Sequence, residues 1–118
     1  MKFHQLPILG LLLAGACVSA QTAPPLQRFI IEREIKGAGA MTSVQLRDAA
    51  QKSNGVLRVL GPDIQWVHSY VAGDKIYCVY NAPSEALIKS HAEQSGFPAN
   101  RITPISAVID PTTANARR

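Results

Sequence analysis

The chain has 118 residues, a formal net charge of +4 and 47% hydrophobic residues. This length allows no more than one domain, and its basic residues are scattered, with only Arg117 and Arg118 adjacent. Nucleic-acid binding needs a clustered stripe of positive charge, so we expect no nucleic-acid partner.

The first twenty residues have the pattern of a signal peptide. Lys2 supplies a positive charge, residues 6–16 form an apolar run, and small residues precede a cleavage site before Gln21. Spanning a membrane needs about 20 apolar residues, so we predict export, periplasmic or secreted, with no membrane contact after cleavage. A lipid anchor on Cys17 is the weaker alternative. Loss of Cys17 leaves Cys78 single, so no intramolecular disulfide can form.

The remaining chain divides into a linker, a domain and a tail. Removing 20 of the 118 residues leaves 98, which is enough for one small core without disulfides or metal. Residues 21–27 contain two adjacent prolines and are expected to form a short extended linker. The domain is predicted to span residues 28–113, followed by a frayed tail at 114–118.

The first strand is predicted from Arg28 to Ile35. Alternation places Phe29 and Ile31 on one side and puts Glu32 and Glu34 together on the other. Two carboxylates on one face are most simply a solvated surface. They also share that face with a histidine from a later strand, which makes them candidate metal ligands.

A helix is predicted from about Ser43 to Leu60. Thr42 and Gln45 have the spacing of a capping box, and apolar residues follow at helical spacing. Two glycines at 37 and 39 precede the helix without the spacing of a phosphate-binding loop, so we interpret them as a connection.

A β-hairpin is predicted from Ile64 to Pro83, with its turn at Gly73 and Asp74. Pairing His68 with Val79 sorts the side chains onto two faces. The expected core face carries Val67, Ser69, Val71, Ile76, Cys78 and Tyr80. The other face is aromatic and carries Ile64, Trp66, His68, Tyr70, Tyr77 and Val79.

A second helix is predicted to begin after Ser84 and to end at Gly96, and a last strand is predicted from Ile102 to Asp110. The order β-α-β-β-α-β indicates an α+β, ferredoxin-like fold, with a four-stranded antiparallel sheet and both helices on one face. The bare face should then be covered by a second copy of the chain, in an interface that includes the aromatic residues Trp66, Tyr70 and Tyr77.

Several short motifs, taken together, resemble the SCO4226-like family of small ferredoxin-like domains, which includes a dimeric nickel-binding protein. The resemblance covers roughly Phe29 to Thr113. Its motifs are Ile31-Glu32-Arg33-Glu34, Gly61-Pro62-Asp63, Trp66 to Val71, Asp74 to Tyr80, His91-Ala92 and Gly96-Phe97-Pro98-Ala99. It implies a ferredoxin-like homodimer and a divalent metal cofactor, possibly nickel.

Imidazole and carboxylate groups suit nickel, zinc or copper, so His68, Glu32 and Glu34 are the candidate metal ligands. One strand should separate His68 from the carboxylates, by about 9 to 10 Å, so a second copy is expected to complete the site. His91 is the weaker candidate, because a histidine on the apolar stripe of a helix is more often a hydrogen-bonded core residue.

Two other functions remain open on the sequence. The aromatic face could simply be the interface of a dimeric, non-catalytic interaction module. Alternatively, the chain could resemble the cofactor-free enzymes of the dimeric α+β-barrel type, with His68 as a general base. That likeness is one of fold alone.

Overall fold

The computed structural model describes residues 10, 12, 14–17 and 24–117. Most of the predicted signal peptide, including its cleavage site, lies outside the described residues. Export therefore stays a prediction, which the mass of the protein purified from its native host would check. No helix in the described part of the chain is long and apolar enough to cross a membrane.

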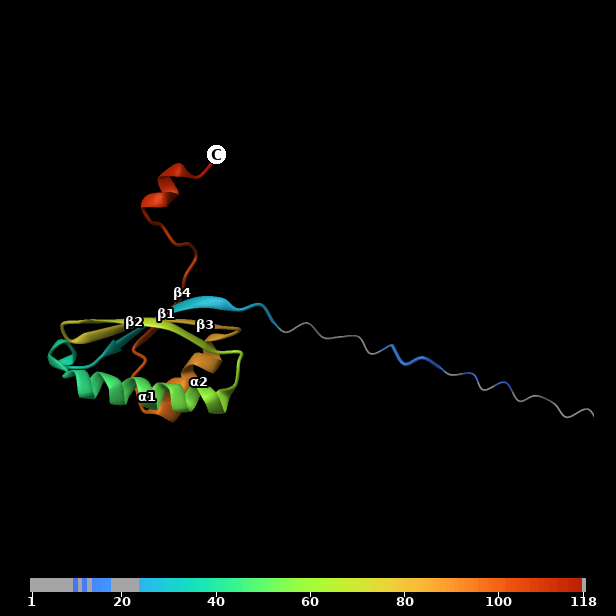
Figure 1. The fold of residues 1–118 in the computed structure, drawn as a ribbon, viewed down its shortest axis with the longest axis horizontal. Helices are drawn as coiled ribbons and strands as arrows, with labels where there is room; N and C mark the ends of the chain where they lie inside the picture. Colours follow the sequence, from blue (N-terminus) through green and yellow to red (C-terminus); the bar gives the residue numbers. More distant parts are fainter. Residues whose placement is uncertain (1–9, 11, 13, 18–23, 118) are drawn as a thin grey trace, which may run out of the picture.

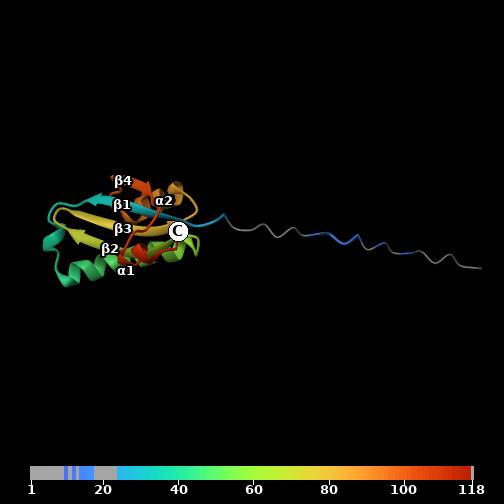
Figure 2. The same ribbon diagram turned by 90° about the horizontal axis from the view of Figure 1, so that it is seen from above.

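The described residues form a four-stranded antiparallel sheet with the strand order β2-β3-β1-β4. Its elements are β1 (Gln27–Glu34), η1 (Ala38–Ala40), α1 (Ser43–Leu60), β2 (Gln65–Ala72), β3 (Lys75–Ala82), α2 (Glu85–Ser95), β4 (Arg101–Pro104) and η2 (Pro111–Asn115). Both long helices lie on one side of the sheet (Figures 1 and 2). The predicted α+β, ferredoxin-like fold is confirmed.

The helices begin where their capping residues predict. The Thr42 side chain accepts from the backbone N–H of Gln45, and the Gln45 side chain accepts from Thr42, which completes a capping box at the start of α1. Ser84 caps α2 by accepting from the backbone N–H of Leu87. These bonds satisfy backbone donors that the first helical turn leaves free.

The hairpin turn is as predicted. Gly73 has a φ of 60°, which favours glycine, and the pairs Ala72–Lys75, Tyr70–Tyr77 and His68–Val79 all form. The backbone N–H of Gly39 donates to the Gly73 carbonyl at 2.7 Å. A Cβ at Gly39 would lie 3.1 Å from that oxygen, so the connection before α1 needs glycine to pack against the hairpin tip.

The predicted alternation is wrong before His68. In β2, Trp66 pairs with Tyr80 while His68 pairs with Val79, so Val67 is an extra residue that forms a β-bulge. The bulge reverses the faces of the preceding residues. Trp66 packs against the core and stacks on Tyr80 at 6.5 Å, and Ile64 is buried. Val67, expected in the core, is exposed.

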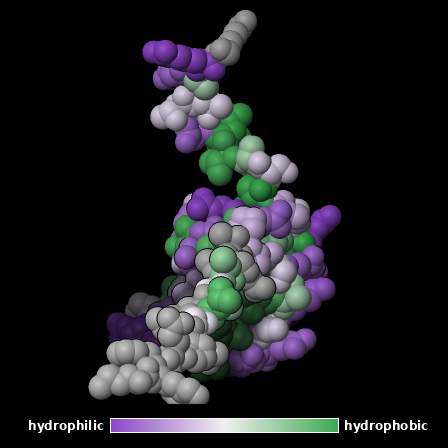
Figure 3. Space-filling view, turned by 90° about the vertical axis from the view of Figure 1, so that its right-hand side faces the viewer, coloured by the Kyte–Doolittle hydropathy of each residue, from purple (hydrophilic) through white to green (hydrophobic). Residues whose placement is uncertain are grey.

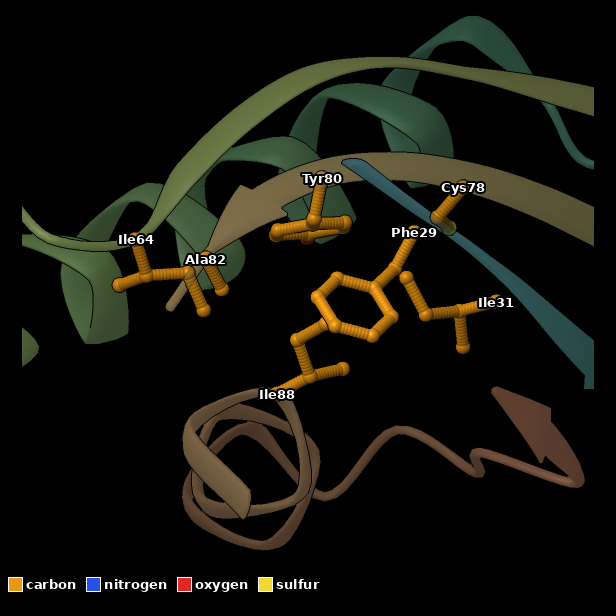
Figure 4. Packing of buried hydrophobic residues seen from close by; sticks show 7 residues of the cluster. All are labelled: Phe29, Ile31, Ile64, Cys78, Tyr80, Ala82 and Ile88. Carbon is orange, nitrogen blue, oxygen red and sulfur yellow. The ribbon is translucent and has the colours of Figure 1, made fainter. Parts of the chain in front are cut away.

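The hydrophobic core lies between the sheet and the helices (Figure 4). Phe29 and Ile31 of β1 meet Ile88, which reaches up from α2. Fully burying a side chain of this size contributes about 1.5 to 3 kcal/mol. The remaining members of the cluster are Ile64, Cys78, Tyr80 and Ala82. Cys78 is thus the small buried residue that the core face predicted.

The last strand is shorter than predicted. β4 ends at Pro104, although the backbone N–H of Ile105 still donates to the Arg28 carbonyl at 2.8 Å. Beyond it the chain leaves the sheet on the side opposite the helices (Figure 1). Residues 114 and 115, expected in a frayed tail, belong instead to η2, whose start Asp110 caps by accepting from Thr112.

Candidate functional site

The predicted metal ligands His68, Glu32 and Glu34 lie on the face of the sheet that no helix covers, which we call the open face. The strand register places Glu32 opposite Tyr77, and Tyr77 opposite Tyr70, in one row across β1, β3 and β2. His68 is opposite Val79 in the next row. The expected grouping on one face is therefore present.

His68 is exposed and accessible to a ligand. Its ring lies edge-on to the ring of Tyr70, with centroids 4.9 Å apart and planes at 72°. Such edge-to-face pairs are favourable and restrict the ring orientation. The imidazole is thus held at the open face by an aromatic neighbour on its own strand.

The two carboxylates differ in their surroundings. Glu32 forms an ion pair with Lys75 at 3.5 Å, and both side chains are partly exposed. Glu34 is exposed and stands opposite Lys75 in the ladder. A metal ion would compete with Lys75 for Glu32, whereas Glu34 forms no ion pair within the described residues.

The strand β3 separates His68 from Glu32 and Glu34. Two strand spacings amount to about 9 to 10 Å, which is too wide for direct coordination of one ion. Accordingly, residues 24–117 and the few described before them contain no cluster of three His, Cys, Asp or Glu side chains. A single chain does not assemble these ligands into a metal site.

The three predicted interface residues do not lie together. Tyr70 is 60% exposed on the open face, and Tyr77 is half-buried beside it. Trp66 lies on the helix side because of the bulge, where its Nε1–H donates to the Ser69 hydroxyl at 2.9 Å. For Tyr70 and Tyr77, a role in an interface stays a prediction. Trp66 instead packs within its own chain.

His91 is fully buried between α2 and the sheet. Its Nε2 lies 3.1 Å from the Ser53 hydroxyl, which also contacts the Tyr80 hydroxyl at 3.1 Å. Burial, reinforced by the positive charge of Arg33, lowers the pKa of His91. This residue is a neutral core histidine, as the simpler sequence interpretation held, and it is remote from the open-face ligands.

Sequence reasoning missed a buried cation. Arg33 is only 3% exposed; its Nε–H donates to Cys78 Sγ at 3.3 Å and its Nη1 donates to the Pro98 carbonyl at 2.6 Å. Its guanidinium also lies 5.7 Å from the centre of the Phe97 ring. The alternation that placed Phe29 and Ile31 on the core face could have placed Arg33 there too.

The family model described as nickel responsive protein SCO4226-like matches residues 29–105, well over half of the chain. The chain belongs to this family. The crystal structure of SCO4226 from Streptomyces coelicolor A3(2) matches with a TM-score of 0.58 and 24% identity, over 70% of this chain and 99% of that chain. A search of curated proteins finds no match.

Membership of the SCO4226-like family connects the chain with nickel through the family's description, nickel responsive. The similarity to the solved structure supports the fold alone, because the identity is low. The same fold can carry unrelated functions, so residue roles must come from the geometry of this chain.

The pKa of His91 makes stability depend on pH. Because that pKa is below its ordinary value of about 6.5, the unfolded chain binds a proton first as the pH falls. We expect the free energy of unfolding to drop below about pH 6.5, by up to about 1.4 kcal/mol per pH unit, the limit for one proton. Urea unfolding of the parent and of His91→Gln, from neutral pH downward, would measure this contribution.

The His91→Gln variant should lose less stability than the parent over that pH range. The matched control is His68→Gln, which removes an exposed imidazole. Its free energy of unfolding should depend on pH as that of the parent does. If the free energy of unfolding falls equally with pH in the parent and in His91→Gln, then the fold does not hold His91 neutral.

Proposed function

We propose that this protein binds a divalent transition metal, nickel or an ion of similar ligand preference, through His68 and Glu32 or Glu34, with a second copy completing the site. One observation carries the proposal. An accessible imidazole and two carboxylates share one uncovered sheet face, yet one strand separates them within the chain. The family's description as nickel responsive supports the choice of metal.

Two-fold symmetry would resolve the separation of the ligands. In an isologous dimer each contact occurs twice, so His68 of one copy can approach a carboxylate of the other. Two such sites would form, related by the symmetry axis. Water molecules could occupy the remaining positions around an ion that needs more than two protein ligands.

The open face has the character of a surface that another chain covers. Tyr70 is exposed there, and Tyr77 and Val79 lie beside it on the same face, Tyr77 half-buried and Val79 buried. On the same side, the segment after β4 carries Val108 and Ile109, and Ile109 is 85% exposed (Figures 1 and 3). A stable interface buries about 1,200 to 2,000 Å². The face and this apolar segment together offer a second copy a surface to cover.

The ligand chemistry favours a borderline metal. Neutral imidazole suits nickel, zinc and copper, whereas calcium and magnesium prefer oxygen ligands alone. Protons compete with the metal for imidazole, so binding should weaken in acid. If Glu32 takes part, its ion pair with Lys75 must open. An exposed ion pair of this kind contributes little, about 1 kcal/mol or less, so metal can displace it.

Replacing His68 by alanine should abolish or strongly weaken metal binding. Loss of one protein ligand is expected to reduce the affinity for nickel by well over tenfold, which is about 1.4 kcal/mol or more. Calorimetric titration of nickel and of zinc into the parent and into His68→Ala would measure this. His91→Gln, which removes a buried imidazole, is the matched control and should bind like the parent.

Two results would contradict the assignment. In the first, His68→Ala binds nickel as tightly as the parent does. In the second, the parent binds neither ion at about 100 μM, a concentration well above the dissociation constant of a micromolar site. The open face would then be better explained as the interface of a non-catalytic interaction module.

Replacing Tyr70 by lysine should disrupt the dimer. The substitution places a charge in the centre of the proposed interface, where desolvation of an unpaired charge is costly. The parent should be a dimer by light scattering at micromolar concentration, and Tyr70→Lys should be a folded monomer. The control is Val59→Lys, because Val59 is 78% exposed on α1, away from the open face. A monomeric parent, or a dimeric Tyr70→Lys, would refute the proposed interface.

A further inference from the structure

A cavity of about 120 Å³ lies between the sheet and α1, on the side opposite the proposed metal ligands. Its walls are largely apolar and include Leu46, Ala49 and Ala50 of α1, with Trp66 and Ile76 of the sheet. Polar groups are few, and Arg33 is the one cation among the residues that line it. The cavity thus combines an apolar body with a single charged group.

Arg33 borders this cavity and has one buried donor without a partner in the part of the chain that the structure describes. Its Nε and Nη1 are hydrogen-bonded, but the buried Nη2 has no partner among the described residues. Nor does any carboxylate pair with it, since the two ion pairs of the described chain join Glu32 to Lys75 and Glu85 to Lys89. The guanidinium therefore lies inside the protein without a counter-anion.

A buried charge of this kind is costly unless it is paired and hydrogen-bonded. Arginine cannot escape the cost by losing its proton. No neighbouring side chain that the structure describes supplies a negative charge. His91 is neutral, and burial raises the pKa of Tyr80, so its hydroxyl is only a neutral polar neighbour of Arg33. An anion in the cavity would supply the missing charge and the missing acceptor.

We propose that this cavity binds a small apolar carboxylate. Its charge pairs with the Arg33 guanidinium, whose Nη2 turns toward the ligand, and its apolar body lies against Ala50 and Trp66. Guanidinium and carboxylate form strong, charge-assisted hydrogen bonds. A doubly charged phosphate suits the site less well, since the other walls offer little to replace its hydration.

The volume sets the size of the ligand. An apolar cavity of about 150 Å³ is known to hold benzene, so one of about 120 Å³ has room for an apolar group of about four or five carbon atoms. Short branched carboxylates such as isovalerate meet this limit. Because the cavity and the open face lie on opposite sides of the sheet, this proposal does not depend on metal binding.

The single tryptophan of the chain, Trp66, lines the cavity and so reports binding. Isovalerate and its uncharged analogue isovaleramide would each be titrated into the full domain, with Trp66 fluorescence as the readout. We expect saturable binding of isovalerate, about tenfold or more tighter than that of the amide, since only the carboxylate pairs with Arg33.

Three variants locate the site. Arg33→Gln should remove the preference for the carboxylate, and Ala50→Leu should fill the cavity and weaken both ligands. Arg28→Gln is the matched control, because Arg28 is an exposed arginine near the start of the same strand. It should bind both ligands like the parent. If Arg33→Gln does not fold, the comparison of acid and amide in the parent, together with Ala50→Leu, still decides the question.

The proposal is overturned if the parent shows no saturable change with isovalerate, or if acid and amide bind equally. It is also overturned if a folded Arg33→Gln keeps the preference. This failure is distinguishable from failure of the metal proposal. His68→Ala should lose nickel binding but leave isovalerate binding unchanged.

Discussion

Coverage of only one face of the sheet by helices is the constraint that organises this molecule (Figures 1 and 2). Strands β1 and β3 present Phe29, Ile31 and Tyr80 to the two helices, and these residues form the core (Figure 4). Side chains alternate along a strand, so the residues between those that β1 and β3 direct to the core must point to the open face. The chemistry of the chain is therefore divided between a helix-covered side and the open face.

The two sides differ in the kind of ligand they can take. The open face holds an exposed imidazole, at His68, and carboxylates at Glu32 and Glu34, which are groups that suit a metal ion. The helix-covered side holds a buried guanidinium, Arg33, beside an apolar cavity, which suits an anion. The two proposed ligands, a metal cation and a carboxylate, would thus bind on opposite sides of one sheet. His91, which is neutral and buried, lies on the helix-covered side.

Much of the fold follows from local patterns in the sequence, because capping residues and turn glycines act through neighbouring atoms. The capping box at Thr42 and the turn at Gly73 are examples. The bulge at Val67 could not be predicted, since one extra residue leaves the composition of a strand unchanged while reversing the faces before it. The separation of His68 from the carboxylates followed from strand order. The cavity did not, because it depends on how side chains from distant elements pack.

A mixing experiment tests most directly whether two copies share the metal site. His68→Ala should bind no nickel, and neither should the double variant Glu32→Gln, Glu34→Gln. A mixed dimer of the two retains one site, formed by His68 of the second variant and the carboxylates of the first. After random exchange of copies, about half of the dimers are mixed, so about a quarter of the parent's nickel sites should return. No recovery in dimers shown to have exchanged would contradict a site shared between copies.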